Sequence, residues 1–305
     1  MNGTINMPGG GGGSAGHDPR ERVLAGVPVT DRAMLLAGVP TAVIDGGSGA
    51  PVVLLHSSGE FAALWLRVIA ELVTDHRVVA PDLPGHGASQ AAGGRMDADR
   101  VLAWLGELIE RTCLAPPVLV GHGLGGAIAA RFAAHHGDRL AGLVLVDSFG
   151  LAPFDPAPSF GIALHRFLEE PTEATRDSLF QQCFVDLDRL RDQLGERWEA
   201  LAAYALDRAR TPDQQAALGT LMPEFGMPMI PPSELARIAV PTAMIWGRHD
   251  LQVRLPVAEA ASVRYGWPLH VIDDAGDDPA LEQPTAFLAA LRTALSTTTP
   301  QGAVR

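Results

Sequence analysis

Short runs of valine, leucine and isoleucine alternate with amphipathic helical patterns along most of this 305-residue chain. Runs that are apolar at nearly every position are typical of strands buried on both faces, and intervening helices let neighbouring strands lie parallel. The sequence therefore predicts an α/β fold with a mostly parallel central sheet. The predicted strands are 41–44, 52–56, 77–80, 118–120, 143–147, 242–246 and 270–272, and the predicted helices are 61–73, 97–112, 124–136, 254–265 and 284–296.

One segment breaks the alternation. Residues 149–236 have helical patterns throughout and no convincing strand, which indicates an all-helical cap inserted between two strands of the sheet. The core of the fold then comprises residues 21–148 and 237–297. We expect residues 1–20, which contain five consecutive glycines, to be a disordered lead-in, and residues 298–305 to be a flexible tail.

The composition narrows the range of partners. A net charge of −12 disfavours binding to nucleic acid or to an anionic membrane surface. No apolar run is long enough for a membrane span, and no signal peptide is evident. Cys113 and Cys183 lie in helical patterns far apart in the sequence, which favours buried free thiols. We expect a cytoplasmic monomer or homodimer that binds a small molecule and needs no metal or cofactor.

A glycine-rich turn follows the fourth predicted strand. Its sequence, Gly121-His122-Gly123-Leu124-Gly125, leads into a helical run of small residues. The nucleophile elbow G-x-S-x-G has this strand–turn–helix arrangement, with a serine where this chain has Gly123. The same glycines also fit a dinucleotide-binding fingerprint, with Asp147 as the ribose-binding acid. That interpretation ranks lower, because the turn follows three earlier strands rather than opening the fold.

Four further segments match the template of the elbow, in the same order. They are Leu54–Gly59, Asp82–Ser89, Ile245–Asp250 and Ala275–Pro284. Together with the elbow they resemble the α/β-hydrolase superfamily, and in particular its members with a helical cap, such as epoxide hydrolases, haloalkane dehalogenases and C–C bond hydrolases. The resemblance covers roughly residues 35–297.

The resemblance implies a catalytic triad that has lost two members. Asp250 occupies the position of the triad acid, Asp277 that of the histidine, and Ser57 replaces a glycine of the oxyanion loop. Without a serine and a histidine, the chain cannot use the serine mechanism. Glycine also relieves the backbone strain of an elbow, so Gly123 suggests that this position no longer has to supply a nucleophile.

Two interpretations of Asp277 stay open. It is either one more exposed loop carboxylate or one half of a pair with Asp250, which the family geometry places close to it. Like charges held close together raise one pKa, and such a pair can donate and accept protons. His249, next to Asp250 in the sequence, is a candidate for a relocated base.

Other candidate residues surround the expected cleft. By family position, the backbone N–H groups of Leu124 and Ser58 would form the oxyanion hole. The candidate substrate contacts are His56, Ser57, His122 and Gly123 in the core and Phe160, Phe225 and Met227 in the cap. Each has a structural alternative: the histidines as fold residues, the hydroxyl as a helix cap, and the cap residues as plain core.

These observations favour a non-hydrolytic enzyme that acts on a mid-sized hydrophobic carbonyl compound by proton transfer, as a lyase, decarboxylase, isomerase or cyclase. The alternatives are a catalytically dead binder of small molecules, and a hydrolase in which a carboxylate activates water without a covalent intermediate. If the alignment with the triad is right, Gly123→Ser combined with Asp277→His is expected to create esterase activity.

Overall fold

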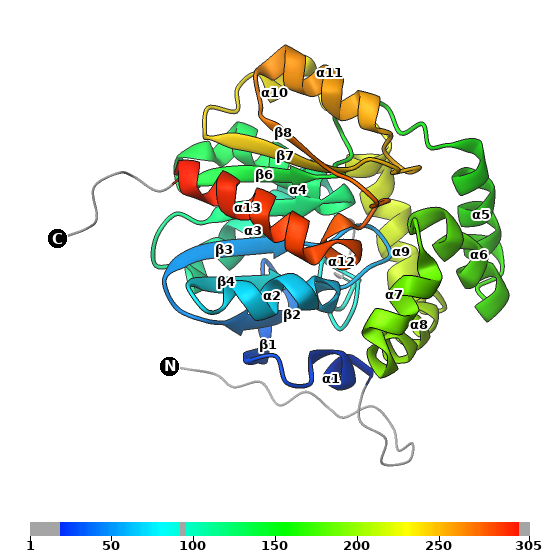
Figure 1. The fold of residues 1–305 in the computed structure, drawn as a ribbon. Helices are drawn as coiled ribbons and strands as arrows, with labels where there is room; N and C mark the ends of the chain where they lie inside the picture. The colour runs from blue at the N-terminus through cyan, green and yellow to red at the C-terminus, as the bar shows by residue number, and fades with distance from the viewer. Residues whose placement is uncertain (1–18, 92–95, 299–305) are drawn as a thin grey trace.

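A computed structural model describes residues 19–91 and 96–298. Within these ranges eight strands form one twisted sheet, with helices packed on both faces (Figure 1). The strands are β1 (Val29–Leu36), β2 (Val39–Gly46), β3 (Ala50–Leu55), β4 (His76–Pro81), β5 (Val118–His122), β6 (Gly142–Val146), β7 (Thr242–Gly247) and β8 (Leu269–Ile272). The prediction of an α/β fold with a mostly parallel sheet is confirmed.

The strand order is β1-β2-β4-β3-β5-β6-β7-β8. Strands β3 to β8 pair in parallel, whereas β1 pairs antiparallel with β2, and β2 antiparallel with β4. The sequence did not predict β1. This edge strand is exposed at most positions and carries Asp31 and Arg32, so it lacks the continuous apolar run by which the buried strands were recognised.

Helices lie at each of the five places that the sequence predicted, and two further short helices, at 137–139 and 279–282, were not predicted. The helices that cover the sheet are η1 (Ala62–Trp65), α2 (Leu66–Leu72), α3 (Ala98–Thr112), α4 (Gly123–His136), η2 (Gly137–Arg139), α11 (Leu255–Tyr265), α12 (Pro279–Glu282) and α13 (Pro284–Thr298). The predicted helix over 61–73 divides in two, a 3₁₀ turn followed by α2. Cys113 follows α3, and both it and Cys183 are free, half-buried thiols.

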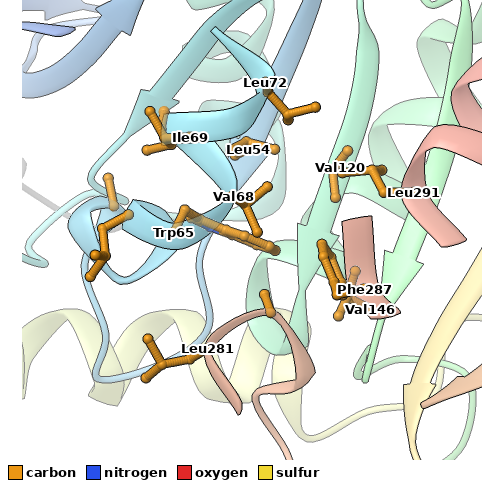
Figure 2. Close-up of a cluster of buried hydrophobic side chains, with 14 of the residues drawn as sticks. Leu54, Trp65, Val68, Ile69, Leu72, Val120, Val146, Leu281, Phe287 and Leu291 are labelled. Atoms are coloured by element: carbon orange, nitrogen blue, oxygen red, sulfur yellow. The ribbon is translucent and has the colours of Figure 1, made fainter. Parts of the chain in front are cut away.

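Alternating strand residues build the two layers of the core. Figure 2 shows Leu54, Val120 and Val146, from three neighbouring strands, in the cluster that contains Trp65 and Phe287. The adjacent strand residues, such as Leu55, Leu119 and Leu145, point to the opposite face and pack with α3, α4 and α11. Burying such a side chain stabilises the fold by roughly 1.5–3 kcal/mol, which fixes the register of each strand.

The segment between β6 and β7 is helical in the structure. It contains α5 (Pro158–Glu169), α6 (Glu173–Cys183), α7 (Leu187–Leu194), α8 (Glu196–Ala209), α9 (Pro212–Leu221), the short π-helix η3 (Met222–Gly226) and α10 (Pro232–Leu235). Helices α5 to α9 lie together at one end of the sheet (Figure 1). The helix-cap residues Thr172, Asp186 and Thr211 each accept a backbone N–H, which explains where α6, α7 and α9 begin.

The predicted boundaries at the chain ends need one revision. Residues 1–18 and 299–305 lie outside the described residues, so most of the predicted lead-in and tail is not tested. Residues 19 and 20, assigned to the disordered lead-in, instead begin helix α1 (Pro19–Leu24). Arg20 is buried and pairs with Asp82 at 2.6 Å and with Asp31, which ties α1 to the loop after β4. Within the described residues, no helix has the length and apolar character needed to cross a bilayer.

Candidate functional site

The polar side chains that the sequence selected lie where parallel strands end. His56 follows β3, His122 ends β5, and Asp147, Asp250 and Asp277 lie in the loops after β6, β7 and β8. The carboxyl ends of parallel strands meet at one edge of a sheet, and ligands of α/β proteins bind in the crevice outside that edge. The topology therefore brings these five residues to one end of the sheet, the end that the helical insertion covers (Figure 1).

A cavity of about 690 Å³ lies between the insertion and this edge. Its walls are mostly apolar: α5, α6, α8 and α9 contribute one side, and the loops after β3, β6 and β8 the other. Aromatic side chains form much of this surface, including Phe149, Phe154, Phe160, Phe180 and Trp198. A volume in this range fits a mid-sized apolar molecule.

The space that a nucleophile would need at the elbow is filled. Gly123 has φ +48°, a left-handed conformation that favours glycine. A Cβ atom placed on Gly123 would overlap the Oγ of Ser57 and lie 2.7 Å from Ser57 Cβ. The two residues thus act as a pair: the hydroxyl side chain is on the loop after β3, and the residue without a side chain is on the elbow. A double substitution of Gly123→Ser and Asp277→His alone would therefore collide with Ser57, which revises our expectation for that variant.

The expected oxyanion hole is only half available. The backbone N–H of Leu124 donates to Ser57 Oγ at 3.4 Å, and Leu124 is buried away from the cavity wall. Ser58 does line the cavity. Of the two donors inferred by family position, Ser58 alone lies where a ligand could reach it, and Ser57 is 2 % exposed and outside the lining.

His56 has a structural role in this arrangement. Its Nδ1 lies 2.8 Å from the carbonyl oxygen of Ser57, and its Nε2 accepts the N–H of Leu83 at 2.9 Å. Complete burial, reinforced by nearby His86, lowers the pKa of His56 to about 3, so the ring is neutral. His56 holds two loops together and does not line the cavity.

His122 forms a buried ion pair with Glu60. The Nδ1 of His122 lies 3.3 Å from Glu60 Oε2, and its Nε2 lies 2.6 Å from the carbonyl oxygen of Asp277. Burial alone would lower the pKa of His122, but the Glu60 carboxylate outweighs it and raises that pKa well above its usual value. Burial would likewise raise the pKa of Glu60, and the His122 charge holds it below its usual value. His122 is therefore an imidazolium that donates two hydrogen bonds.

Glu60 is held in place at the cavity wall. Its Oε2 also accepts the backbone N–H of Ser57 at 2.8 Å, and its side chain is 20 % exposed. It lines the cavity, whereas His122 lies behind it. Sequence reasoning missed Glu60, although its position directly after Ser57-Ser58-Gly59, in the expected oxyanion loop, was an available signal.

Asp277 and Asp278 place two more carboxyl groups on the same wall. Both are 7 % exposed, so the interpretation of Asp277 as an exposed loop carboxylate does not hold. Burial, and then the charge of Asp250, raise the pKa of Asp277 well above its usual value. Burial, reinforced by Glu60, raises the pKa of Asp278 to about 7. The thiol of Cys183 forms a hydrogen bond with the Asp277 carboxyl.

Asp250 lies behind this wall and does not contact the cavity. Its Oδ1 accepts the N–H groups of Gln252 and Val253 at 2.6 and 3.0 Å. Burial raises the pKa of Asp250 to about 7, partly opposed by those N–H groups. The Oδ2 atoms of Asp250 and Asp147 are both buried and accept no hydrogen bond from the described residues. Burial, and then the charge of Asp250, raise the pKa of Asp147 well above its usual value. Asp147, the candidate ribose-binding acid of the dinucleotide interpretation, does not line the cavity. Its backbone has a positive φ of 40°.

The four remaining candidates differ in where their side chains lie. His249 is exposed, outside the cavity lining, and only its backbone N–H is engaged, by Ala275. Phe225 is fully buried in the core, where the Arg131 guanidinium lies 5.1 Å from its ring centroid. Phe160 and Met227 both line the cavity, and Met227, at 49 % exposure, lies at its rim. His249 was selected by its sequence neighbour alone, and a residue next to a buried strand end commonly points outward.

The fold and the site permit comparison with known proteins. Residues 52–291 match the alpha/beta hydrolase family, and this range includes the elbow, the buried acids and the helical insertion. The chain belongs to the alpha/beta hydrolase family. The 2-hydroxy-6-oxononadienedioate/2-hydroxy-6-oxononatrienedioate hydrolase of Escherichia coli is 29% identical over 255 residues, covering 77% of this chain and 83% of that protein.

Other proteins match over shorter stretches of this chain. The 2-hydroxy-6-oxo-2,4-heptadienoate hydrolase of Pseudomonas putida is 34% identical over 125 residues, 40% of this chain and 45% of that protein. The dihydrolipoyllysine-residue acetyltransferase component of the acetoin cleaving system of Pseudomonas putida is 37% identical over 108 residues, 35% of this chain. The alignment spans 29% of that protein's length.

Solved structures show the same fold. The 2-hydroxy-6-oxo-6-phenylhexa-2,4-dienoate hydrolase from Rhodococcus sp. strain RHA1 superposes with a TM-score of 0.76, at 22% identity, over 88% of this chain and 99% of that one. The naproxen esterase from Bacillus subtilis superposes with a TM-score of 0.75, at 17% identity, over 91% of this chain and 95% of that one. At these identities the likeness concerns the fold alone.

Proposed function

We propose that this alpha/beta hydrolase family member is a cofactor-independent enzyme that transfers protons to and from a mid-sized hydrophobic carbonyl compound. The observation that carries the proposal is the position of Glu60, Asp277 and Asp278, three carboxyl groups on one wall of an apolar cavity. An apolar cavity retains an apolar substrate, and buried carboxyl groups with separated pKa values provide both an acid and a base.

Covalent catalysis by a serine at the elbow has no place in this chemistry. Gly123 offers no attacking atom, and Ser57 Oγ, which fills that space, accepts the N–H of Leu124 and is outside the cavity lining. Both ring nitrogens of the His122 imidazolium carry a proton and donate hydrogen bonds, to Glu60 and to the Asp277 carbonyl oxygen. His122 therefore has no free lone pair with which to take a proton from Ser57. Proton transfer needs no covalent intermediate and fits what remains.

Asp277 is the proposed acid. Burial and the charge of Asp250 raise its pKa and so favour the protonated carboxyl group, which can donate a hydrogen bond or a proton to a carbonyl oxygen of the substrate. His122 fixes its position through the 2.6 Å contact between Nε2 and the Asp277 carbonyl oxygen. The Leu124 N–H is not available as an oxyanion donor, because it already donates to Ser57 Oγ. The carboxyl group of Asp277 takes over that role. The Ser58 N–H is the second candidate donor.

Asp278 is the proposed base. Its Oδ1 caps helix α12 by accepting the N–H of Leu281 at 3.1 Å, and its Oδ2 accepts no hydrogen bond from the described residues. A pKa of about 7 is close to the value at which a general base is most effective at neutral pH. Removal of a proton next to a carbonyl group by Asp278, with proton donation from Asp277 to the carbonyl oxygen, would generate an enol. Return of a proton to a different carbon completes an isomerase reaction, and departure of a leaving group from the β-carbon completes a lyase reaction.

The test is hydrogen exchange. Apolar methyl ketones are incubated with the protein in heavy water, and deuterium incorporation next to the carbonyl is followed by mass spectrometry. We expect catalysed exchange that falls by a factor of about 10² or more in Asp278→Asn, because Asn keeps the helix cap and loses the base. Asp188→Asn, on the exposed surface of α7, is the matched control. Tight binding of these ketones without exchange in the wild type would instead identify a binder without catalysis.

A hydrolase that activates water directly is the second candidate, because the Escherichia coli relative that matches 77% of this chain is a hydrolase by name. In that case a reporter ester would be hydrolysed without a burst of acyl-enzyme, and Asp278→Asn would abolish the activity. Ester hydrolysis at a rate above ketone exchange would favour this candidate over the first.

A further inference from the structure

Gln214, in the first turn of α9, carries an unsatisfied polar atom in the cavity wall. The side chain is 2 % exposed and lines the cavity. Its Nε2 donates to the carbonyl oxygen of Gly59 at 3.5 Å, which fixes the orientation of the amide, because a carbonyl oxygen requires a donor. Its Oε1 is buried and has no hydrogen-bond partner. A buried carbonyl oxygen without a hydrogen-bond partner destabilises the folded protein, so a ligand that donates a hydrogen bond to it would gain affinity.

Gln214 belongs to the same polar end of the cavity as the acids. Gly59, which its Nε2 contacts, immediately precedes Glu60 in the sequence, and both line the cavity with Asp277 and Asp278. A substrate whose carbonyl group reaches Asp277 can therefore place a second polar group near Gln214. The rest of the lining is mainly aliphatic and aromatic.

The charges of the lining exclude an anionic substrate. Its acids are Glu60, Asp277 and Asp278, and its one basic side chain among the described lining residues is His165, which is 72 % exposed on α5 and pairs with Glu169. A carboxylate would lose its hydration and lie next to like charges, with no Arg or Lys in the described lining to compensate. A cation finds no free counter-charge in Glu60, since His122 already neutralises that carboxylate at 3.3 Å. A cation paired with Asp278 would lower the pKa of that carboxyl group and weaken it as the proposed base.

We infer that the substrate is an uncharged apolar carbonyl compound that carries a hydroxyl group, and that Gln214 Oε1 accepts the hydrogen bond of that hydroxyl. Gln214 is then a specificity-determining residue that sequence reasoning did not select. This inference rests on the proposed function for the carbonyl group, and it separates this chain from relatives whose named substrates are carboxylates, such as the dioates of the Escherichia coli enzyme.

Three matched ligands test the inference by calorimetric titration: a naphthyl methyl ketone, the same ketone with a ring hydroxyl, and the same ketone with a ring carboxylate. We expect the hydroxy-ketone to bind about 5- to 10-fold more tightly than the plain ketone, and the carboxy-ketone to bind at least about 10-fold more weakly. Equal affinities for the hydroxy-ketone and the plain ketone, or tight binding of the carboxy-ketone, would overturn the inference.

Substitutions at Gln214 assign the preference to its oxygen. Gln214→Leu removes the acceptor and is expected to abolish the preference for the hydroxyl, whereas Gln214→Glu keeps an acceptor and retains the preference. Gln215→Leu is the control, because the exposed Gln215 lines the same cavity but donates its Nε2 to Ala209. A preference that survives Gln214→Leu would contradict the assignment.

The binding measurements stand apart from catalysis. If the ligand preferences appear and heavy-water exchange does not, the ligand class is supported and the proposed reaction fails. If exchange occurs and the preferences are absent, the reaction is supported and the role of Gln214 fails. Should Gln214→Leu not fold, the three ligands with the wild-type protein still decide the ligand class.

Discussion

The hydroxyl group of Ser57 occupies the space that a side chain on Gly123 would require. Ser57 stands where the family resemblance places a glycine, and Gly123 where it places a serine. The exchange keeps the total volume at the elbow while it moves the hydroxyl from the cavity side to a buried position 3.4 Å from the Leu124 N–H. The absence of a side chain at Gly123 is thus matched by the presence of a hydroxyl side chain at Ser57, which fills the same space.

This pairing predicts which variants can regain serine chemistry. Gly123→Ser with Asp277→His should remain inert and less stable, because the new side chain collides with Ser57. Adding Ser57→Gly removes the collision and frees the Leu124 N–H, so the triple variant should hydrolyse a reporter ester with a measurable burst. Activity in the double variant equal to that of the triple variant would show that Ser57 does not obstruct the elbow.

The ion pair between Glu60 and His122 should contribute to stability. Glu60→Gln leaves the His122 imidazolium buried without its counter-charge, and we expect the free energy of unfolding to fall by about 1–3 kcal/mol near neutral pH. The ring can lose its proton to limit this cost, so the His122 pKa should fall in the same variant. Guanidinium unfolding and NMR titration of the imidazole measure the two effects.

The control for that variant is Glu169→Gln, which breaks the exposed pair with His165 on α5. An exposed pair of this kind contributes only about 0–1 kcal/mol. Equal destabilisation by the two substitutions would mean that the Glu60–His122 pair is no more important than a surface contact.

The buried acids predict an unusual dependence of stability on pH. Asp250 and Asp278 have folded-state pKa values of about 7, above the ordinary aspartate value, so between about pH 4 and about pH 7 the folded chain binds more protons than the unfolded chain. Their contribution to stability is complete at low pH and is lost as the pH rises through about 7. We expect guanidinium unfolding to show lower stability at about pH 7.5 than at about pH 5.

Asp250→Asn tests the cause of this dependence. Asn keeps the oxygen that accepts the N–H groups of Gln252 and Val253, but it cannot ionise. The fall in stability between the two pH values should shrink by on the order of 1 kcal/mol. An unchanged pH dependence in this variant would show that Asp250 titrates normally.

Most of the fold could be predicted from the sequence, because buried parallel strands such as β5 and β6 are apolar at nearly every position. The edge strand β1 could not, since its residues face solvent. The segments that carry Asp277 and His122 were predicted from their motifs. The roles of Glu60 and Gln214 depend on a contact with His122 and on a missing hydrogen bond, and neither is visible in the order of residues.

Two residues that were predicted to lie in the site do not reach the cavity, again because the sequence does not show side-chain direction. His249 and Phe225 were selected by sequence neighbourhood and residue type, but side-chain direction decides whether a residue reaches a cavity. His249 points to solvent, and Phe225 into the core against Arg131. Positions in the helical insertion were the hardest to assign, because aromatic residues pack in cores and in pockets alike.

The most direct measurement of the central claim compares Asp277→Asn with Ser57→Ala in the heavy-water exchange of an apolar ketone. If carboxyl groups carry the chemistry, Asp277→Asn should lose exchange by a factor of about 10² or more, because the amide cannot supply a proton, while Ser57→Ala stays within about threefold of the wild type. Loss of exchange in Ser57→Ala together with its retention in Asp277→Asn would contradict the account and place the reacting group on Ser57.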